Sequence, residues 1–226
     1  MSTQSPDWNQ EMARIRQLRA ERPRVGPGQR PAVVVVDFQK AFVEHEGCGP
    51  SAAAALEATA ELLAAARTAG VPVIYIKMIL DDLQDRMLAQ RVRSSLTERC
   101  LRGNPWTEIS AVVAPEPGDH VVEKTVATAF YKTRLDDLLA ELGTDELIVA
   151  GTSTSGCVRA TVMDAAYRSY RVSVVEECVD DFRTLSGEVS LWDMQDRFGD
   201  VVGLAETLDR LASLAAGRAG DGTVRA

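Results

Sequence analysis

The sequence predicts an α/β protein with three layers, α/β/α, built on a mainly parallel central sheet of about six strands. Short apolar runs typical of strands alternate along the chain with longer segments whose apolar residues recur at helical spacing. This alternation is typical of parallel sheets with right-handed crossovers and helices on both faces. A length of 226 residues with 46% hydrophobic content suits one α/β core and requires no second domain.

The predicted strands are short apolar runs at residues 31–37, 71–77, 120–124, 146–150 and 171–177, with a short final strand at 200–203. The predicted helices comprise residues 51–69, 134–142, 157–170, 187–198 and 204–214. The first strand is continuously apolar up to a closing carboxylate, as expected of a parallel strand that is buried on both faces. Residues 79–118 are the least regular stretch, with a short helix predicted near 84–93, and so long a connection usually shapes a binding site.

The two ends of the chain lie outside the predicted core. Residues 1–28 are predicted to be a helical arm, with its helix over 8–19, followed by a linker rich in Pro, Gly and Arg. The arm either packs on a neighbouring subunit or lies on its own subunit as a surface helix, and the sequence leaves both open. Residues 29–215 form the single domain, and the small, polar residues 216–226 are predicted to be a disordered tail.

Charge and composition narrow the class of function. A formal charge of −8 and a pI of about 4.9 argue against binding to nucleic acid or anionic membranes, which requires basic patches. The first residues are polar and do not resemble a signal peptide. The four cysteines are scattered without CxxC pairing, which favours thiols over a disulfide framework. We therefore expect a cytoplasmic protein.

One stretch has the pattern of a nucleophile site. The apolar run 146–150 is followed by a turn of small and hydroxyl residues, and Cys157 then opens the predicted helix. A helix N-terminus lowers the pKa of a thiol, and its exposed N–H groups can stabilise an oxyanion. We expect the N–H groups of Ser153 and Cys157 to form such an oxyanion hole.

Two other chemically active residues are predicted to meet Cys157. Asp37 and Lys124 each end a predicted strand, and in parallel sheets sites form beyond the carboxyl ends of the strands. Asp37 could take the thiol proton and pass it to a leaving amine, while the Lys124 ammonium would lower the pKa of both neighbours. This set fits hydrolysis of an amide or ureide through a thioester, chemistry that requires no metal.

Each of these residues also has a structural interpretation. A strand-end aspartate is often a helix cap, a strand-end lysine is usually solvated, and most cysteine thiols pack in cores. We assign that packing role to Cys48, Cys100 and Cys178. Cys157 differs because of the glycine- and hydroxyl-rich turn before it.

The sequence resembles the isochorismatase-like cysteine hydrolase family over residues 31–211. The resemblance rests on the segments VVVVDFQKAF from Val33, EKTVATAF from Glu123 and GTSTSGCV from Gly151. It implies that Asp37, Lys124 and Cys157 match the family's Asp-Lys-Cys triad. It further implies a non-proline cis peptide between Thr152 and Ser153.

Within that family, the chain is most similar to the N-carbamoylsarcosine amidohydrolase branch, through TSGCVRAT from Thr154 and LWDMQDRFGD from Leu191. Members of that branch cleave small ureido or amide acids. The resemblance implies that Arg183 binds the substrate carboxylate, with a surface salt bridge to Asp180 or Asp181 as the alternative. Phe42, Phe130 and Thr154 are further candidates for substrate binding, and core packing is the alternative for both aromatic residues.

Departures from other branches narrow the choice. Nicotinamidases of the family bind a metal through an aspartate and closely spaced histidines, whereas the only two histidines here, His45 and His120, are far apart. We therefore expect no metal and no cofactor. Isochorismatases lack the nucleophilic cysteine, so Cys157 weighs against a vinyl-ether hydrolase.

The preferred hypothesis is a cysteine amidohydrolase that acts on a small, carboxylate-bearing amide or ureido compound and releases ammonia or an amine. The alternatives are a vinyl-ether hydrolase that uses Asp37 as its acid, and a catalytically silent binding subunit. The resemblance also implies a homo-oligomer, with a tetramer favoured.

Overall fold

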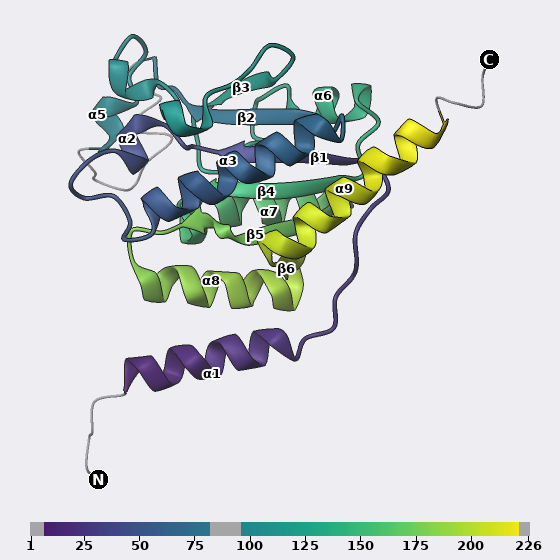
Figure 1. The fold of residues 1–226 in the computed structure, drawn as a ribbon. Coiled ribbons are helices and arrows are strands. Elements are labelled where there is room, and N and C mark those ends of the chain that lie inside the picture. The colour runs from purple at the N-terminus through teal and green to yellow at the C-terminus, as the bar shows by residue number, and fades with distance from the viewer. Residues whose placement is uncertain (1–6, 82–95, 222–226) are drawn as a thin grey trace.

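The computed structural model describes residues 7–81 and 96–221. Its centre is a six-stranded, all-parallel sheet with the strand order β3-β2-β1-β4-β5-β6 (Figure 1). The strands are β1 (Pro31–Val36), β2 (Val73–Met78), β3 (His120–Lys124), β4 (Glu146–Thr152), β5 (Arg171–Asp180) and β6 (Asp200–Val202). The predicted fold class is therefore confirmed.

Helices cover both faces of this sheet. One face packs against α3 (Ala52–Thr68) and α9 (Leu204–Asp221), and the other against α6 (Leu135–Glu141), α7 (Arg159–Tyr167) and α8 (Thr184–Arg197). All six residues of β1 are buried, as its continuous apolar run predicts. Because β1 and β4 pair at the centre of the sheet, their carboxyl ends lie side by side.

The connection from β2 to β3 contains short helices. Its described part includes α5 (Leu96–Arg99) and two 3₁₀ turns, η1 (Pro105–Thr107) and η2 (Ala111–Val113). α5 and η1 pack against α2 (Lys40–Val43), which follows β1 at the carboxyl edge of the sheet, whereas η2 packs against α3. The short helix predicted near 84–93 lies outside the described residues.

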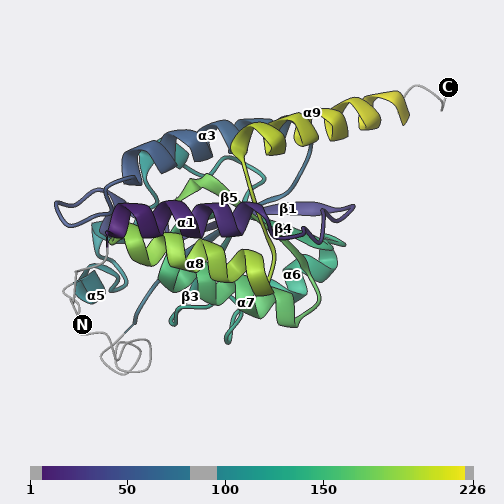
Figure 2. The ribbon, with the colours of Figure 1, turned by 90° about the horizontal axis from the view of Figure 1, so that it is seen from below.

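The predicted N-terminal helix is present as α1 (Trp8–Ala20), and it lies alongside α8 of its own chain (Figure 2). Ion pairs join the two segments, from Arg16 to Glu188 and from Arg22 to Asp196. None of the residues in α1 is buried. Ion pairs to α8, including those to the buried Glu188, therefore help to hold the arm.

The linker after α1 is fixed by carboxylates rather than by secondary structure. Asp200 accepts hydrogen bonds from the N–H groups of Val25 and Gly26, at 2.9 and 2.7 Å. Glu146 accepts one from Gly28 at 2.9 Å. These contacts satisfy backbone donors that no strand or helix would pair.

The disordered tail predicted from Ala216 onward is wrong for residues 216–221, because α9 continues to Asp221. The Arg218 guanidinium donates to the carbonyls of Ala69 and Gly70 at the end of α3, at 2.7 and 2.6 Å. This long-range contact holds the last turns of α9 to the domain. Among residues 7–81 and 96–221, no helix combines the length and the apolar composition that a membrane span needs.

Candidate active site

The structure brings Asp37, Lys124 and Cys157 together at the carboxyl edge of the sheet. Asp37 follows β1, Lys124 ends β3 two strands away, and Cys157 follows β4. The Nζ of Lys124 lies 2.7 Å from Oδ2 of Asp37, and the two side chains are 0% and 1% exposed. Both side chains are close enough to the Cys157 thiol to shift its pKa. Three polar groups from separate strands thus form one buried cluster.

The backbone around Asp37 explains how its carboxylate reaches this position. Asp37 has a φ of 53°, in the left-handed region that aspartate tolerates better than most residues. On the neighbouring strand Gly151 has a φ of 131°, and a Cβ there would lie 2.1 Å from the carbonyl oxygen of Val36. Only glycine therefore permits β4 to approach β1 so closely beside the site.

Lys124 is fixed by three acceptors. Besides the Asp37 carboxylate, its ammonium donates to the carbonyls of Val126 and Ala127, at 3.1 and 2.9 Å. An ammonium has three N–H donors, so the side chain is well satisfied although it is fully buried. Such a cation has little freedom to move away from Asp37.

Cys157 does not open a regular α-helix as predicted. It lies inside a π-helical turn, η3 (Thr154–Val158), and α7 begins only at Arg159 and ends at Tyr167 rather than Tyr170. The N–H of Val158 bonds to the carbonyl of Ser153 at 3.2 Å, five residues back. Wide turns of this kind are frequent at functional sites. Apolar periodicity does not distinguish them from α-helix.

The expected depression of the thiol pKa is also wrong. Burial raises the pKa of Cys157 to about 12, and Asp37 adds to the rise while Lys124 opposes it. Burial likewise raises the pKa of Asp37, against the opposing effect of Lys124. Burial alone would lower the pKa of Lys124, but Asp37 and Cys157 raise it. The resting site therefore holds a neutral thiol beside the buried Asp37–Lys124 pair.

The turn before Cys157 contains a cis peptide bond between Thr152 and Ser153, the position that the family resemblance implied. The hydroxyls of Thr152 and Thr154 both donate to the carbonyl of Asp180, at 3.2 and 3.0 Å. The end of β5 therefore holds the turn from one side.

Known proteins resemble this chain in sequence and in fold. A family model described as the isochorismatase domain matches residues 31–206. The chain belongs to the isochorismatase family. A maleamate amidohydrolase from Pseudomonas putida is 35% identical over 196 residues, covering 85% of this chain and 92% of that protein. An N-carbamoylsarcosine amidase from an Arthrobacter species is 31% identical over 184 residues, with coverages of 79% and 70%.

A solved structure also has a fold similar to that of this chain. The crystal structure of a cysteine hydrolase from Pseudomonas syringae pv. phaseolicola has a TM-score of 0.79 to this chain and 31% sequence identity. The aligned region covers 86% of this chain and 99% of that chain. The relatives named here are therefore hydrolases, and two of them are amidohydrolases or amidases that act on C–N bonds.

The four candidate substrate-binding residues differ in their burial and in their neighbours. Phe42 is half-buried and packs, like Cys157, against a small apolar cluster. Phe130 is instead buried in the main core, between the Tyr170 ring and the Arg168 guanidinium. Phe130 therefore has the core-packing role. Thr154 is buried, and its hydroxyl donates to the carbonyl of Asp180.

Arg183 lies just before α8, which packs against the turn that carries Cys157. Its side chain is exposed, and no carboxylate in the described chain pairs with it, so neither Asp180 nor Asp181 forms the alternative salt bridge. Asp181 instead joins two backbone donors. It accepts from the N–H of Ser155 at 2.6 Å and from the N–H of Arg183 at 3.0 Å.

Two residues with positioning roles were missed by sequence reasoning. One is Asp181, which links the nucleophile turn to Arg183 as described above. The other is Gln39, fully buried, whose amide donates to the carbonyls of Met78 and Thr107, each at 3.0 Å, and accepts from the N–H of Met78 at 2.6 Å. A polar residue two positions after a strand-end Asp37 is a signal that could have drawn attention to Gln39.

No group of three or more His, Cys, Asp or Glu side chains in the described part of the chain is arranged to hold a metal ion.

Proposed function

We propose that this chain is a cysteine-dependent amidohydrolase that cleaves the amide or ureido C–N bond of a small, carboxylate-bearing substrate. The observation that carries the proposal is the buried Asp37–Lys124 pair, which lies close enough to the Cys157 thiol to shift its pKa. A neutral thiol requires a base at the moment of attack, and Asp37 is the carboxylate within its reach. The amidohydrolase relatives support the same class of bond.

The proposed reaction has two halves. Asp37 takes the proton of Cys157 as its sulfur attacks the carbonyl carbon, and then gives it to the departing nitrogen, so that ammonia or an amine leaves and a thioester forms. Water then attacks the thioester while Asp37 accepts a proton, which returns to the sulfur as the acid leaves. Lys124 holds Asp37 in place and balances the negative charge that moves between oxygen and sulfur.

The oxyanion of each tetrahedral intermediate is assigned to the N–H groups of Ser153 and Cys157. The neighbouring donors are already used: Ser155 donates to Asp181, and Gly156 and Val158 donate to the carbonyl of Ser153. The family resemblance implies a role for Arg183 in substrate binding, and Phe42 is assigned to the pocket wall. The cleavage of N-carbamoylsarcosine-like ureido acids or of maleamate-like amides is the finer form of this proposal.

An ammonia-release screen tests the proposal. The substrates are monoamides of four-carbon dicarboxylic acids, ureido acids and lactams, and the controls are Cys157→Ala and enzyme treated with iodoacetamide. We expect at least one class to release ammonia, and acid-quenched wild-type protein to carry the acyl mass on the peptide that contains Cys157. Turnover that survives in Cys157→Ala, or hydrolysis of a vinyl ether without ammonia release, would contradict the proposal. No turnover of any class, with no acyl mass on the peptide that contains Cys157, would favour a silent binding subunit.

A further inference from the structure

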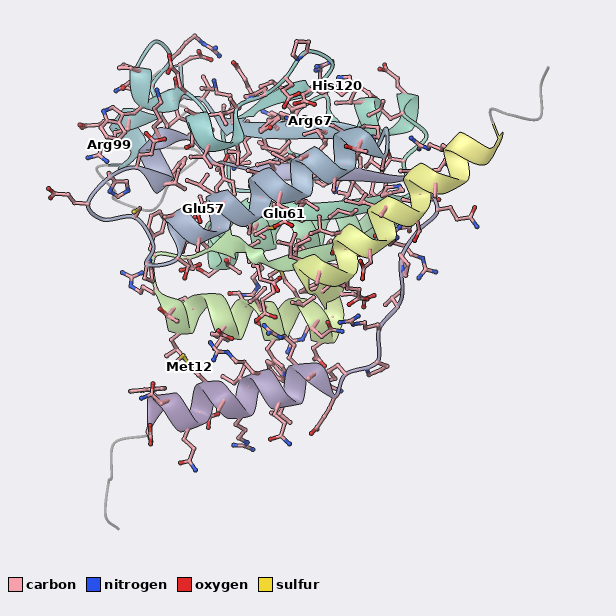
Figure 3. The ribbon with its side chains drawn as sticks, viewed as in Figure 1. Met12, Glu57, Glu61, Arg67, Arg99 and His120 are labelled. Atoms are coloured by element: carbon pink, nitrogen blue, oxygen red, sulfur yellow. The ribbon has the colours of Figure 1, made fainter. Side chains whose placement is uncertain are left out.

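Two buried hydrogen-bond donors near the candidate site have no acceptor. They are Nε2 of His45, on the loop after α2, and Nη1 of Arg99, the last residue of α5. No group in the described chain accepts from either atom. Figure 3 shows Arg99 on α5, at the same edge of the sheet as α2. Buried polar atoms are nearly always hydrogen-bonded in native proteins, so a pair of unused donors indicates an absent acceptor.

The hydrogen bonding of His45 identifies its Nε2 as a donor. The N–H of Gly47 donates to Nδ1 of His45 at 2.9 Å, which leaves the ring proton on Nε2. Burial and the nearby positive charge of Arg99 both lower the pKa of His45. The imidazole is therefore neutral at neutral pH, and it presents an N–H beside the Arg99 cation.

One aromatic ring lies near each of the two donor side chains. The guanidinium carbon of Arg99 lies 4.8 Å from the centroid of the Trp106 ring. The centroid of the His45 ring lies 6.4 Å from that of Phe182, the residue before Arg183. Stacking on Trp106 fixes the plane of the guanidinium, and hence the direction of its N–H groups.

The same region contacts the nucleophile. Trp106 and Phe42 pack, with Cys157, against one apolar cluster that includes Cys100. Cys100 directly follows Arg99 and is within electrostatic reach of Cys157. Through Trp106 and Cys100, the Arg99 donor therefore belongs to the same region as the Cys157 sulfur, and His45 lies within electrostatic reach of Arg99.

We propose that His45 and Arg99 form a binding site for the carboxylate of the substrate, at the end opposite the scissile amide. The assignment rests on the proposed function and names its substrate class: a short chain with an amide or ureido group at one end and a carboxylate at the other. One charged and one neutral donor match a monoanion better than a phosphate dianion. The exposed Arg183 then guides the substrate at the mouth of the site instead of anchoring it.

The test uses a ligand and a readout that do not depend on turnover. Succinate, a four-carbon dicarboxylate, is titrated against alkylation of Cys157 by iodoacetamide, followed by mass spectrometry of the peptide that contains it. Succinamide, its neutral analogue, is titrated in parallel. We expect succinate to protect Cys157 and succinamide to protect it far less.

Variants assign the protection to individual donors. Loss of a hydrogen bond to a charged group predicts about tenfold to hundredfold weaker protection in Arg99→Met and in His45→Phe. His45→Gln keeps an N–H near the Nε2 position and should retain most of the protection. Arg102→Met removes a cation from the same connection, where it pairs with Asp81 and Glu123, and serves as the charge-matched control with unchanged protection.

The outcomes are distinguishable. Equal protection by succinate and succinamide, or loss of protection in Arg183→Met but not in Arg99→Met, would overturn the assignment. A similar loss in Arg102→Met would also overturn it, because the effect would then be one of general charge. Protection that follows the predicted pattern without ammonia release from any amide would leave the carboxylate site standing and reject the proposed function.

Discussion

Replacing Lys124 with methionine removes the cation from a fully buried ion pair and keeps most of the side-chain volume. The Asp37 carboxylate would then lie buried without the charge that is now 2.7 Å away. Removing one partner of a buried pair typically destabilises a protein by about 3–5 kcal/mol, because the remaining charge is uncompensated. The free energy of unfolding of Lys124→Met should therefore fall by about that amount at neutral pH.

The loss should depend on pH in a defined direction. Burial already raises the pKa of Asp37 in the folded state, and removing Lys124 removes an effect that lowers it, so the pKa rises further. A group whose pKa is higher in the folded than in the unfolded state contributes stability at low pH, which is lost as pH rises through the folded pKa. Lys124→Met should therefore be closest to wild type in acid and weakest at neutral pH.

Urea denaturation of the wild type, Lys124→Met and Asp37→Asn/Lys124→Met between acid and neutral pH measures this effect. The double variant has no buried charge, so it should recover most of the lost stability and show a weaker pH dependence. Both variants should be inactive as amidohydrolases, since each lacks a member of the proposed triad. A Lys124→Met protein as stable as wild type at every pH would refute the inference that the two charges depend on each other.

Two further predictions concern positioning and assembly. Gln39→Leu removes three buried hydrogen bonds to the ends of β2 and η1. We therefore expect the free energy of unfolding, measured by urea denaturation, to fall by about 2–4 kcal/mol and turnover to fall with it. A change in that free energy below about 0.5 kcal/mol would show that the amide is not needed there. We also expect a homo-oligomer, as the family resemblance implies. Deletion of residues 1–21 should lower the number of subunits per particle, as measured by light scattering. An unchanged number of subunits would assign α1 to the surface of its own chain.

Much of the fold could be predicted because the information is local. The continuous apolar run of β1 indicates burial on both faces, and the structure has all of its residues buried. The predicted limits of β3 agree with the structure at His120 and Lys124. Because parallel strands place their carboxyl ends at one edge, the meeting of Asp37, Lys124 and Cys157 could be anticipated from strand ends alone.

The errors arose where distant parts of the chain decide the outcome. Arg218 on α9 donates to the carbonyls of Ala69 and Gly70 just after α3, and the composition of the tail carries no information about that contact. The pKa of Cys157 depends on burial among neighbours from other strands, so a rule for helix termini gave the wrong direction. The unused donors of His45 and Arg99 are visible only when their surroundings are known.

The raised pKa of Cys157 has a consequence for how the proposed base must work. A thiol with a pKa of about 12 holds almost no thiolate at neutral pH, so the proton must leave as the sulfur attacks. The burial that suppresses the thiolate also raises the pKa of Asp37, and so makes that carboxylate a stronger base. The charge of Lys124 opposes that rise in the pKa of Asp37. The buried pair thus replaces a free thiolate with a proton acceptor that acts only when a substrate carbonyl lies beside the sulfur.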